Sequence, residues 1–495
     1  MTSAPGLIAV VAVTVATLAI GMWGLRFSRT TSDFFVASRS VRPGLNASAI
    51  GGEYLSAASF LGVAGLVLIF GADMMWYPVG WTAGYLMLLV LIAAPLRRSG
   101  AYTLPDFAEA RLGSPLARAT CSVLVVAIGW LYLLPQFQGA GLTLEAAIGA
   151  PRWAGALVVG AIVLVNVLTG GMRSVTFVQA FQYWLKLSAM LIPAAILLVV
   201  WLDDGAPRPA AGGDTNWSFP VADGGAPGLY LTYSLILATF LGTMGLPHVV
   251  VRFYTNPDGS AARRTTVVVL ALLGLFYVLP PIYAALGRVY AGSADSEVMV
   301  LELPGLMVDG FAGNVLTGIV TAGAFAAFLS TSSGLTIAVA GVLAQDAVGR
   351  ARPNGVTAFR ISAVLAVLVP CAMALAAPDL GIARAVGLAF AVAASTFCPL
   401  LVLGIWWRGL TDIGAVAGLL TGFAGSAVGV WYAMFPPEID GWPHALLSQP
   451  AAWSVPLAFA TMILLSRATP GRRPATVNQF MVRLHTPETV VLDRG

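Results

Sequence analysis

The stretch A-I-G-G-E-Y-L-S-A-A-S-F-L-G, residues 49–62, decides the fold of this 495-residue chain. It lies inside an apolar run that is long enough to cross a bilayer. Within that run it places two glycines, one acid and two serines at membrane depth: Gly51, Gly52, Glu53, Ser56 and Ser59. Lipid cannot satisfy a freed backbone carbonyl, so unwinding at such residues is tolerated only beside a cavity or an ion. The stretch therefore predicts a broken transmembrane helix.

A second apolar run carries the same kind of interruption. It reads F-L-G-T-M-G-L-P-H over residues 240–248, with Gly242, Gly245 and Pro247 inside it. Small residues also allow helices to pack closely, and either stretch alone is compatible with that simpler explanation. Two interrupted spans that lie five apart along the chain are typical of inverted-repeat transporters, whose binding site lies near the membrane midplane. We therefore expect both helices to be unwound.

The composition excludes most soluble classes. Hydrophobic residues make up 58% of the chain and charged residues 10%, whereas soluble domains carry about 25% charged residues. The net charge of +4 is spread over short loops, which indicates membrane orientation and not nucleic-acid binding. The sequence contains no G-x-x-x-x-G-K-[ST] motif, which argues against an ATP-driven pump. Its three cysteines lie in apolar runs, where a disulfide framework is not expected.

Runs of roughly 20 apolar residues predict about thirteen transmembrane spans. These spans lie near residues 6–26, 45–71, 74–96, 115–148, 153–170, 175–201, 229–254, 264–289, 310–345, 355–377, 384–407, 412–435 and 451–466. Arginines gather in alternate loops and acids in the others, which predicts an outside N-terminus and an inside C-terminus. The Gly- and Pro-rich loop from Asp203 to Gly228 is then extracellular. A charged segment from Tyr102 to Arg111 is expected to form a short cytoplasmic surface helix, and the chain after Pro470 a mobile cytoplasmic end.

Adjacent hydroxyls in the ninth span suggest a cation site. The segment A-F-L-S-T-S-S-G-L-T, residues 327–336, places Ser330 and Thr331 on one helical turn. Each hydroxyl offers lone pairs to a hard cation such as sodium. Serine and threonine also commonly bond back to their own helix carbonyls, and that alternative is the default without the broken second span.

Several motifs in a fixed order resemble the sodium/solute symporter family, and within it the cation/acetate (monocarboxylate) branch. The resemblance covers nearly the whole chain. Its motifs are T-S-D-F-F-V-A-S-R (31–39), G-G-E-Y-L-S-A-A-S-F-L-G (51–62), T-G-G-M-R-S-V-T-F-V-Q (169–179), G-L-P-H-V-V-V-R-F (245–253), F-L-S-T-S-S-G-L-T (328–336), G-I-W-W-R (404–408) and G-A-V-A-G (414–418).

The resemblance implies an all-α membrane protein with a LeuT-type core of two inverted five-helix repeats. One transporter domain would span residues 1–470, followed by a cytoplasmic tail at 471–495. Its parts would be a flanking helix at 6–26, repeats at 45–201 and 229–407, and C-terminal flanking helices at 412–466. The family's conserved sodium site, carried onto this sequence, falls on carbonyls of Gly52, Leu55 and Ala327 and hydroxyls of Ser330 and Thr331.

The implied activity is symport of a short monocarboxylate such as acetate, propionate or pyruvate, driven by a cation across a bacterial inner membrane. Sodium is the expected coupling ion, and no other cofactor is expected. Proton coupling, or sodium symport of another small solute, remains an alternative. An enzyme or sensor would need a nucleophile–base pair, a metal cluster or a signalling domain, and the sequence shows none of these. The expected partners are the carboxylate substrate and membrane lipid; the sequence indicates neither nucleic acid nor an obligate protein partner.

Two charged residues within spans need a separate explanation. Glu53 stands where the acetate branch has an aspartate, and it could ligate a cation, carry a proton or bond the unwound backbone. An embedded acid costs roughly 2.5–3.5 kcal/mol on insertion scales, which favours a functional role. Lys186, the only lysine in the sequence, lies about ten residues into the sixth span. It could pair with an acid or anion, but snorkelling toward an interface is the expectation.

Other polar or helix-breaking residues near the two interruptions are candidates for substrate contact or gating. The substrate-cavity candidates are Ser56, Ser59, Gln136, Gln138, Thr243 and Met244. The gate or structural candidates are Pro247, His248 and Arg252, together with Lys186.

Overall fold

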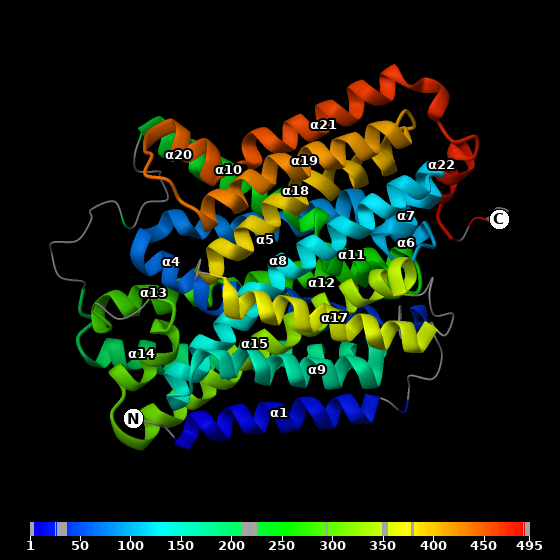
Figure 1. Ribbon diagram of the computed structural model, residues 1–495. Coiled ribbons are helices and arrows are strands. Elements are labelled where there is room, and N and C mark those ends of the chain that lie inside the picture. Colours follow the sequence, from blue (N-terminus) through cyan, green and yellow to red (C-terminus); the bar gives the residue numbers. More distant parts are fainter. Residues whose placement is uncertain are drawn as a thin grey trace.

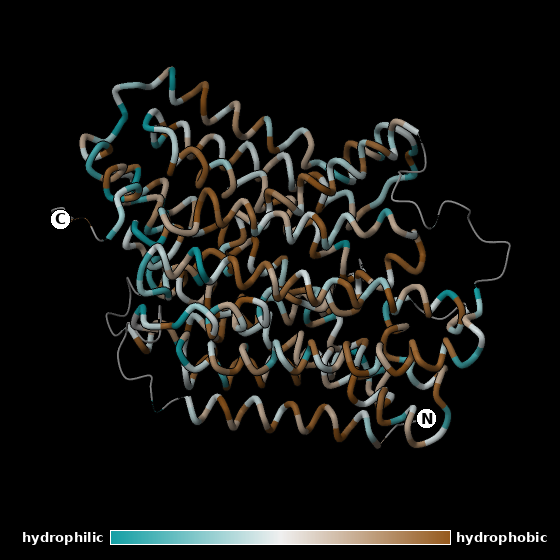
Figure 2. The backbone as a smooth tube through the Cα atoms, turned by 180° about the vertical axis from the view of Figure 1, so that it is seen from behind, coloured by the Kyte–Doolittle hydropathy of each residue, from teal (hydrophilic) through white to brown (hydrophobic). Residues whose placement is uncertain are grey.

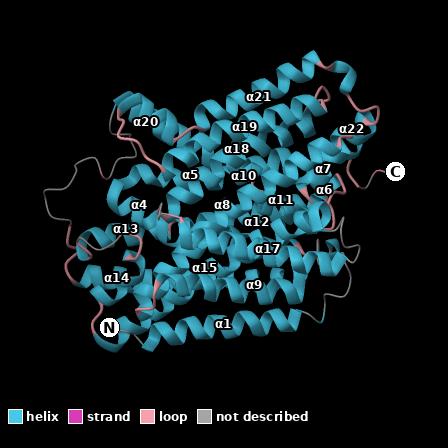
Figure 3. Cartoon of the chain, viewed as in Figure 1, coloured by secondary structure: helices cyan, strands magenta, loops and turns pink. Residues whose placement is uncertain are grey.

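The computed structural model describes residues 4–24, 26, 37–208, 217, 225–292, 296–348, 355–377, 381–488 and 490. Every regular element within these residues is helical (Figures 1 and 3). Eleven of the helices are long and apolar enough to cross a membrane. Figure 2 shows hydrophobic residues along the helix shafts and hydrophilic residues gathered nearer their ends. The all-α membrane architecture predicted from the sequence is confirmed for the described residues.

The helices of the first half carry the first interruption. They are α1 (Ala4–Gly24), α3 (Pro43–Tyr54), the π-helical turn η3 (Ala58–Gly62), α4 (Val63–Phe70), α5 (Trp76–Met87), η5 (Leu88–Ile92), α6 (Ala93–Arg98), α7 (Leu104–Leu112), α8 (Pro115–Ile148) and α9 (Arg152–Asp203), with short 3-10 turns at Ala37–Arg39 and Gly71–Met75.

The helices of the second half carry the second interruption. They are α10 (Gly225–Gly245), α11 (Pro247–Val251), the 3-10 turn η6 (Arg252–Thr255), α12 (Gly259–Tyr277), α13 (Leu279–Tyr290), α14 (Met299–Met307), α15 (Gly310–Leu343), η7 (Ala344–Val348), α17 (Gly355–Ala376), α18 (Ile382–Trp406), α19 (Asp412–Met434), α20 (Gly441–Ser448), α21 (Ala451–Ala468), the turn Pro470–Arg472 and α22 (Val477–His485).

Both predicted helix breaks are present. Helix α3 ends at Tyr54, and Leu55 leaves the helical region with φ −72° and ψ 82° before the chain becomes helical again. Helix α10 ends at Gly245, and Leu246 is extended with φ −69° and ψ 118°. Pro247 then starts α11 at the first helical position, where its missing N–H costs nothing. Glycine, serine and proline in apolar runs therefore located both interruptions correctly.

Two of the eleven long helical stretches each combine two predicted spans. Residues 58–98 and 152–203 extend over 41 and 52 residues. Within the second stretch Gly171 has φ 56° and ψ −160°, so the helical path is broken there. A Cβ on Gly21 of α1 would meet both Asn166 and Val178, one from each side of Gly171. The chain therefore folds back at Gly171. The number of membrane crossings and their orientation remain predictions.

Burial separates central helices from flanking ones. The most apolar 18-residue windows of α15 and α18 are 94% buried, whereas that of α1 is 28% buried. Figure 1 shows α1 and α21 at opposite edges of the bundle, with the N- and C-termini at opposite ends. The polar motif of residues 327–336 therefore lies in the centre of the protein. Its Ser330, Thr331 and Ser333 hydroxyls bond to carbonyls, whereas those of Ser332 and Thr336 have no partner among the described residues.

The C-terminal segment differs from its prediction as a mobile end. Helix α22 is amphipathic and buries Leu484 completely. The Phe480 ring lies 6.0 Å from that of Phe107 on α7, and Arg483 Nε donates to the Arg98 carbonyl at 3.1 Å. The expectation of a mobile end is therefore wrong for residues 477–485. The predicted short helix is present as α7, which Thr103 and Asp106 cap reciprocally, and its cytoplasmic position stays a prediction. Most of the predicted loop 203–228, and most of the motif at 31–39, lie outside the described residues.

Cysteine labelling tests the predicted orientation. Asp203 and Gly471 are both exposed, and the native cysteines are buried. We expect Asp203→Cys to react with an impermeant maleimide applied to intact cells, and Gly471→Cys to react only after the membrane is opened. If Asp203→Cys reacts only after the membrane is opened, the predicted orientation of the chain is the wrong way round.

Candidate functional site

The break in α3 frees backbone carbonyls, and a lysine from another helix binds them. Lys186 of α9 is completely buried. Its Nζ donates to the carbonyl of Gly52, to that of Leu55 at 2.7 Å and to the hydroxyl of Ser330 at 2.9 Å. The amine therefore points into the centre of the protein. The expectation that Lys186 snorkels toward an interface is wrong, because the freed carbonyls offer it acceptors inside the bundle.

The hydrogen-bond pattern around Lys186 suits the charged ammonium form of its side chain. Ser330 Oγ donates its single hydrogen to the Ala327 carbonyl at 3.1 Å, so it can only accept from the amine. The carbonyls of Gly52 and Leu55 are acceptors as well. Three acceptors around one nitrogen match the three N–H donors of the charged ammonium form.

The five residues predicted to bind sodium do come together around the break. Three of the five predicted oxygens, those of Gly52, Leu55 and Ser330, are hydrogen-bonded to Lys186. Of the other two, the Ala327 carbonyl accepts from Ser330, and Thr331 Oγ1 donates to the Glu53 carbonyl at 2.6 Å. The arrangement is thus a cation site in which the cation belongs to the chain.

Glu53 and Arg252 form a buried ion pair beside this site. Arg252 Nε lies 2.6 Å from Glu53 Oε2, and the two side chains are 1% and 2% exposed. The guanidinium also donates to Thr176 at 3.0 Å and to the side-chain oxygen of Gln179. A Cβ on Gly334 of α15 would overlap the Glu53 carboxyl group, so the absence of a side chain there makes room for the acid. The pair joins the broken helix to the element that follows the second break.

Gln179 completes the network and was not singled out from the sequence. Its Nε2 donates to the Ser330 carbonyl at 2.8 Å and to Glu53 Oε2 at 3.4 Å, and its own carbonyl lies over Gly52. It ends the motif at residues 169–179, and an uncharged amide inside a span was the available signal. Its partners, however, lie 73 to 151 residues away in sequence.

Four of the substrate-cavity candidates lie at the breaks. Gln136 Oε1 accepts from the backbone N–H of Ala57 at 3.1 Å, which satisfies the first turn after the break. Thr243 of α10 bonds Tyr54 of α3 at 2.8 Å and so joins the two broken helices directly. Ser59 bonds Tyr277 of α12 at 2.9 Å and so ties the turn after the first break to a neighbouring helix. Ser56 is buried within the break itself.

The remaining substrate-cavity and gate candidates lie at different distances from the two breaks. Gln138 donates to the carbonyl of Ala377 at the end of α17, at 3.5 Å, and so bonds away from the break. Met244 is buried one residue before the end of α10. His248 is fully buried, and its ring lies 5.2 Å from that of Tyr132. Because His248 follows Pro247 at the start of α11, it belongs to the second break.

Aromatic rings gather between the two breaks. The Phe390 ring of α18 lies 5.5 Å from Trp81, 5.9 Å from Tyr132 and 6.2 Å from Tyr54. Tyr85 packs on Tyr54 at 4.8 Å. We call Tyr54, Trp81, Tyr85, Tyr132 and Phe390 the aromatic cluster. Within the described part of the chain, Trp81 Nε1 and Tyr85 Oη of this cluster have no hydrogen-bond partner, and neither does Gln136 Nε2 one turn after Tyr132 on α8. The ring nitrogens of His248, which packs on Tyr132, also have none.

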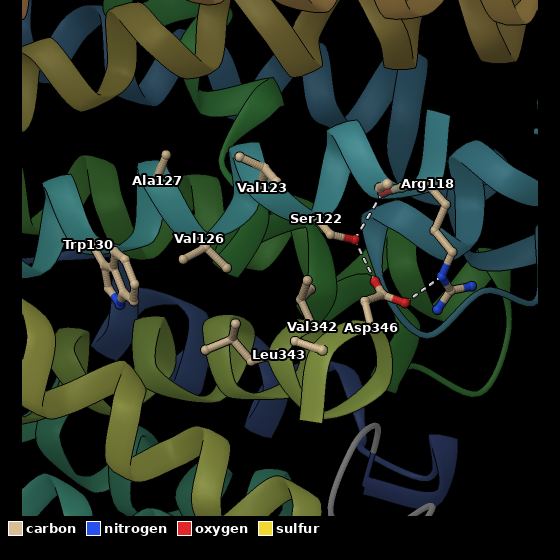
Figure 4. A pocket seen from close by; sticks show the side chains of 11 residues that line it. Arg118, Ser122, Val123, Val126, Ala127, Trp130, Val342, Leu343 and Asp346 are labelled. Carbon is tan, nitrogen blue, oxygen red and sulfur yellow. Dashed lines mark hydrogen bonds and ion pairs between the residues drawn. The ribbon is translucent and has the colours of Figure 1, made fainter. Parts of the chain in front are cut away.

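A separate pocket of about 400 Å³ lies between α8 and the end of α15. Its lining is apolar over Val123, Val126 and Trp130, with an ion pair between Arg118 and Asp346 at one end (Figure 4). None of the predicted site residues lines it. It is therefore a feature of the outer face of α8, and the chemistry of the break lies elsewhere.

Comparison with known proteins identifies the family. The profile described as "Sodium:solute symporter family" matches residues 34–422. The chain belongs to the sodium:solute symporter family. It is 32% identical over 466 residues to the "Uncharacterized symporter YwcA" of Bacillus subtilis, with 90% of each chain covered. It is 30% identical to a "Monocarboxylic acid transporter" of Corynebacterium glutamicum, covering 88% of this chain and 86% of the relative.

Solved structures support the fold of this sodium:solute symporter family member. A Na+-coupled sialic acid symporter, in a substrate-bound outward-open state, superposes with a TM-score of 0.71 at 13% identity, covering 94% of this chain and 98% of the other. The nucleobase-cation-symport-1 family transporter Mhp1 superposes with a TM-score of 0.50 at 14% identity, covering 92% and 99%. Both are transporters, and both likenesses concern the fold alone.

The buried pair in this family member yields a stability prediction. Glu53→Gln or Arg252→Met should each destabilise the protein by about 3–5 kcal/mol, because each leaves one charge buried without its partner. The double variant should recover part of that loss, since it buries neither charge. Thermal midpoints of purified protein in detergent would measure the effect.

The exposed pair Arg152–Glu145 is the matched control, with side chains 55% and 47% exposed. Glu145→Gln should lower the free energy of unfolding by less than about 1 kcal/mol, because exposed ion pairs contribute little to stability. Equal effects at the two pairs would contradict the assignment of Glu53 and Arg252 as a desolvated pair.

Proposed function

We propose that this protein is a secondary active transporter that carries a short monocarboxylate, such as acetate, propionate or pyruvate, together with a cation across the bacterial inner membrane. The observation that carries the proposal is the set of unpartnered donors at the aromatic cluster. The similarity to the Corynebacterium transporter, whose printed name includes monocarboxylic acid, supports the same substrate class.

The donors suit a carboxylate. Trp81 Nε1, Tyr85 Oη and Gln136 Nε2 are buried without partners, and an unmade hydrogen bond of this kind costs roughly 1–3 kcal/mol. Trp81 and Tyr85 lie four residues apart on α5 and so share a face. A carboxylate offers two oxygens that only accept, and the surrounding rings provide an apolar contact for a short carbon chain. A small carboxylate would therefore satisfy both requirements.

The local charge also favours an anion. Glu53 supplies one negative charge, and Arg252 and Lys186 supply one positive charge each. One negative and two positive charges leave a net charge of one positive at the breaks. In a low-dielectric interior this charge attracts an anionic solute more strongly than it would in water.

Access to the donors requires movement. Trp81, Tyr85 and Gln136 are each no more than 1% exposed. A solute can reach them only when the elements around the breaks move apart, which is the behaviour expected of alternating access about a fixed midplane site. The two breaks, at residues 55–56 and at Leu246, are the natural hinges because the backbone leaves the helical conformation at Leu55 and at Leu246.

The cost of moving an anion against the membrane potential explains why a co-transported cation is required. Moving an anion inward against a negative-inside potential costs about 2.3 kcal/mol per 100 mV, and one accompanying cation cancels that cost. Membership in the sodium:solute symporter family supports sodium as this ion. A proton is the alternative, and the position of Lys186 favours a coupling that does not place sodium at the predicted oxygens.

Counterflow in proteoliposomes tests the substrate class without depending on any ion gradient. Vesicles loaded with unlabelled acetate should take up labelled acetate, and propionate and pyruvate should compete with it. Glucose and proline should not compete. Exchange of a sugar without exchange of acetate would place the protein in another branch.

Removing one donor tests the assigned position. Tyr85→Phe should raise KM for acetate about tenfold or more, because a hydrogen bond to a charged group is worth about 1.5–3 kcal/mol. Tyr290→Phe is the matched control, since its hydroxyl bonds Asp204 at the protein surface. If both variants keep the native KM, the aromatic cluster does not bind the carboxylate.

A further inference from the structure

We infer that the ammonium of Lys186 takes the place of a sodium ion at the break in α3, and that transport by this protein does not require sodium. The inference deepens the proposed function and rests on it, because it concerns which cation serves the monocarboxylate site. The description of the family implies sodium coupling, and the inference departs from it because of the position of Lys186.

The first argument is occupancy. The nitrogen of Lys186 contacts the carbonyls of Gly52 and Leu55 and the hydroxyl of Ser330. These are three of the five oxygens that the sequence predicts as sodium ligands. An ammonium and a sodium ion carry the same charge, and both bind carbonyl and hydroxyl oxygens. The tethered cation therefore satisfies the same acceptors that a free ion would satisfy.

The second argument is exclusion. The two other predicted ligands, the Ala327 carbonyl and Thr331 Oγ1, each make one hydrogen bond and keep a lone pair, so the exclusion rests on charge. A sodium ion bound beside the ammonium would sit within a few ångströms of a like charge. Two unit charges 4 Å apart repel by about 4 kcal/mol even at an effective dielectric constant of 20. Sodium and the Lys186 ammonium therefore cannot share these oxygens.

The third argument is that the surroundings stabilise the tethered charge. Helix α3 ends at Tyr54, so its last carbonyls, at the negative end of the helix dipole, face the amine. The charged side chains of the neighbouring elements are Glu53 on α3 and Arg252 on η6, which pair with each other. α15 contributes the neutral hydroxyls of Ser330 and Thr331. The ammonium thus has three acceptors and a nearby carboxylate, as a stable buried cation needs.

The fourth argument is the choice of a lysine at position 186. Lys186 is the only lysine in a sequence whose loops use arginine throughout. A lysine fits here where an arginine would not, because a compact ammonium with three donors matches three converging oxygens, whereas a guanidinium is planar and forked. The choice of residue therefore follows the geometry of a monovalent ion site.

Uptake of labelled acetate by the reconstituted full-length protein tests the inference, with sodium replaced by choline on both sides. Native protein should give the same counterflow rate with and without sodium, within about twofold. A tenfold or larger loss without sodium would overturn the inference. Failure of counterflow in both media would instead reject the proposed substrate.

A substitution should convert the site. Lys186→Ala removes the tethered cation and leaves the oxygens of Gly52, Leu55 and Ser330 free, so sodium should now raise its counterflow about tenfold by occupying them. Lys186→Ala with Ser330→Ala should lose most of that stimulation. Trp184→Ala is the control on the same helix, because Trp184 is 52% exposed and should leave the native behaviour unchanged.

A binding measurement covers the case in which Lys186→Ala folds but does not transport. Sodium should raise the thermal midpoint of Lys186→Ala and not that of the native protein, relative to choline. Sodium stabilisation of the native protein, or none for a folded Lys186→Ala variant, would contradict the inference. If Lys186→Ala does not fold, the sodium-free counterflow and sodium shift of the native protein decide the question.

Discussion

A helix cannot break inside a membrane unless protein groups bind the backbone atoms that the break exposes, and this constraint governs the centre of the molecule. The end of α3 exposes carbonyls, which Lys186 binds, and the segment that follows exposes the N–H of Ala57, which Gln136 binds. These partners come from α9 and α8. The break is thus a junction between three helices, and the packing of the central bundle is arranged around it.

The same junction concentrates charge. Glu53, Lys186 and Arg252 come from three separate elements and lie together without access to solvent. Each charge would be costly alone, and each is made tolerable by hydrogen bonds to the others or to the broken backbone. Gln179 and Thr176 bind the remaining nitrogens of Arg252, so each nitrogen of the guanidinium has a partner.

Local chemistry made the helices and both breaks predictable. Apolar length located the spans, and Ser56 and Pro247 lie at the breaks themselves, whereas Gly51 and Gly52 remain helical just before the first one. The partner of Lys186 could not be predicted in the same way, because its carbonyls lie more than a hundred residues away and are exposed only after the bundle forms. Gln136 and Gln138 show the same limit: they are two residues apart and so face different directions, and only Gln136 reaches the break. The amphipathic α22 was missed because a short polar segment reveals its docking surface only when α7 is in place.

Because the Lys186 amine is attached to the chain, the contact between α9 and the broken end of α3 responds differently to ion concentration than a site for a free ion would. A diffusible ion occupies a site in proportion to its concentration, whereas a side chain on an adjacent helix is present at a fixed effective concentration. The bonds that hold α9 to the broken end of α3 therefore form in any salt solution and on either side of an ion gradient. A fall in the sodium concentration therefore does not empty these oxygens, and the contact between α9 and the end of α3 does not depend on that concentration.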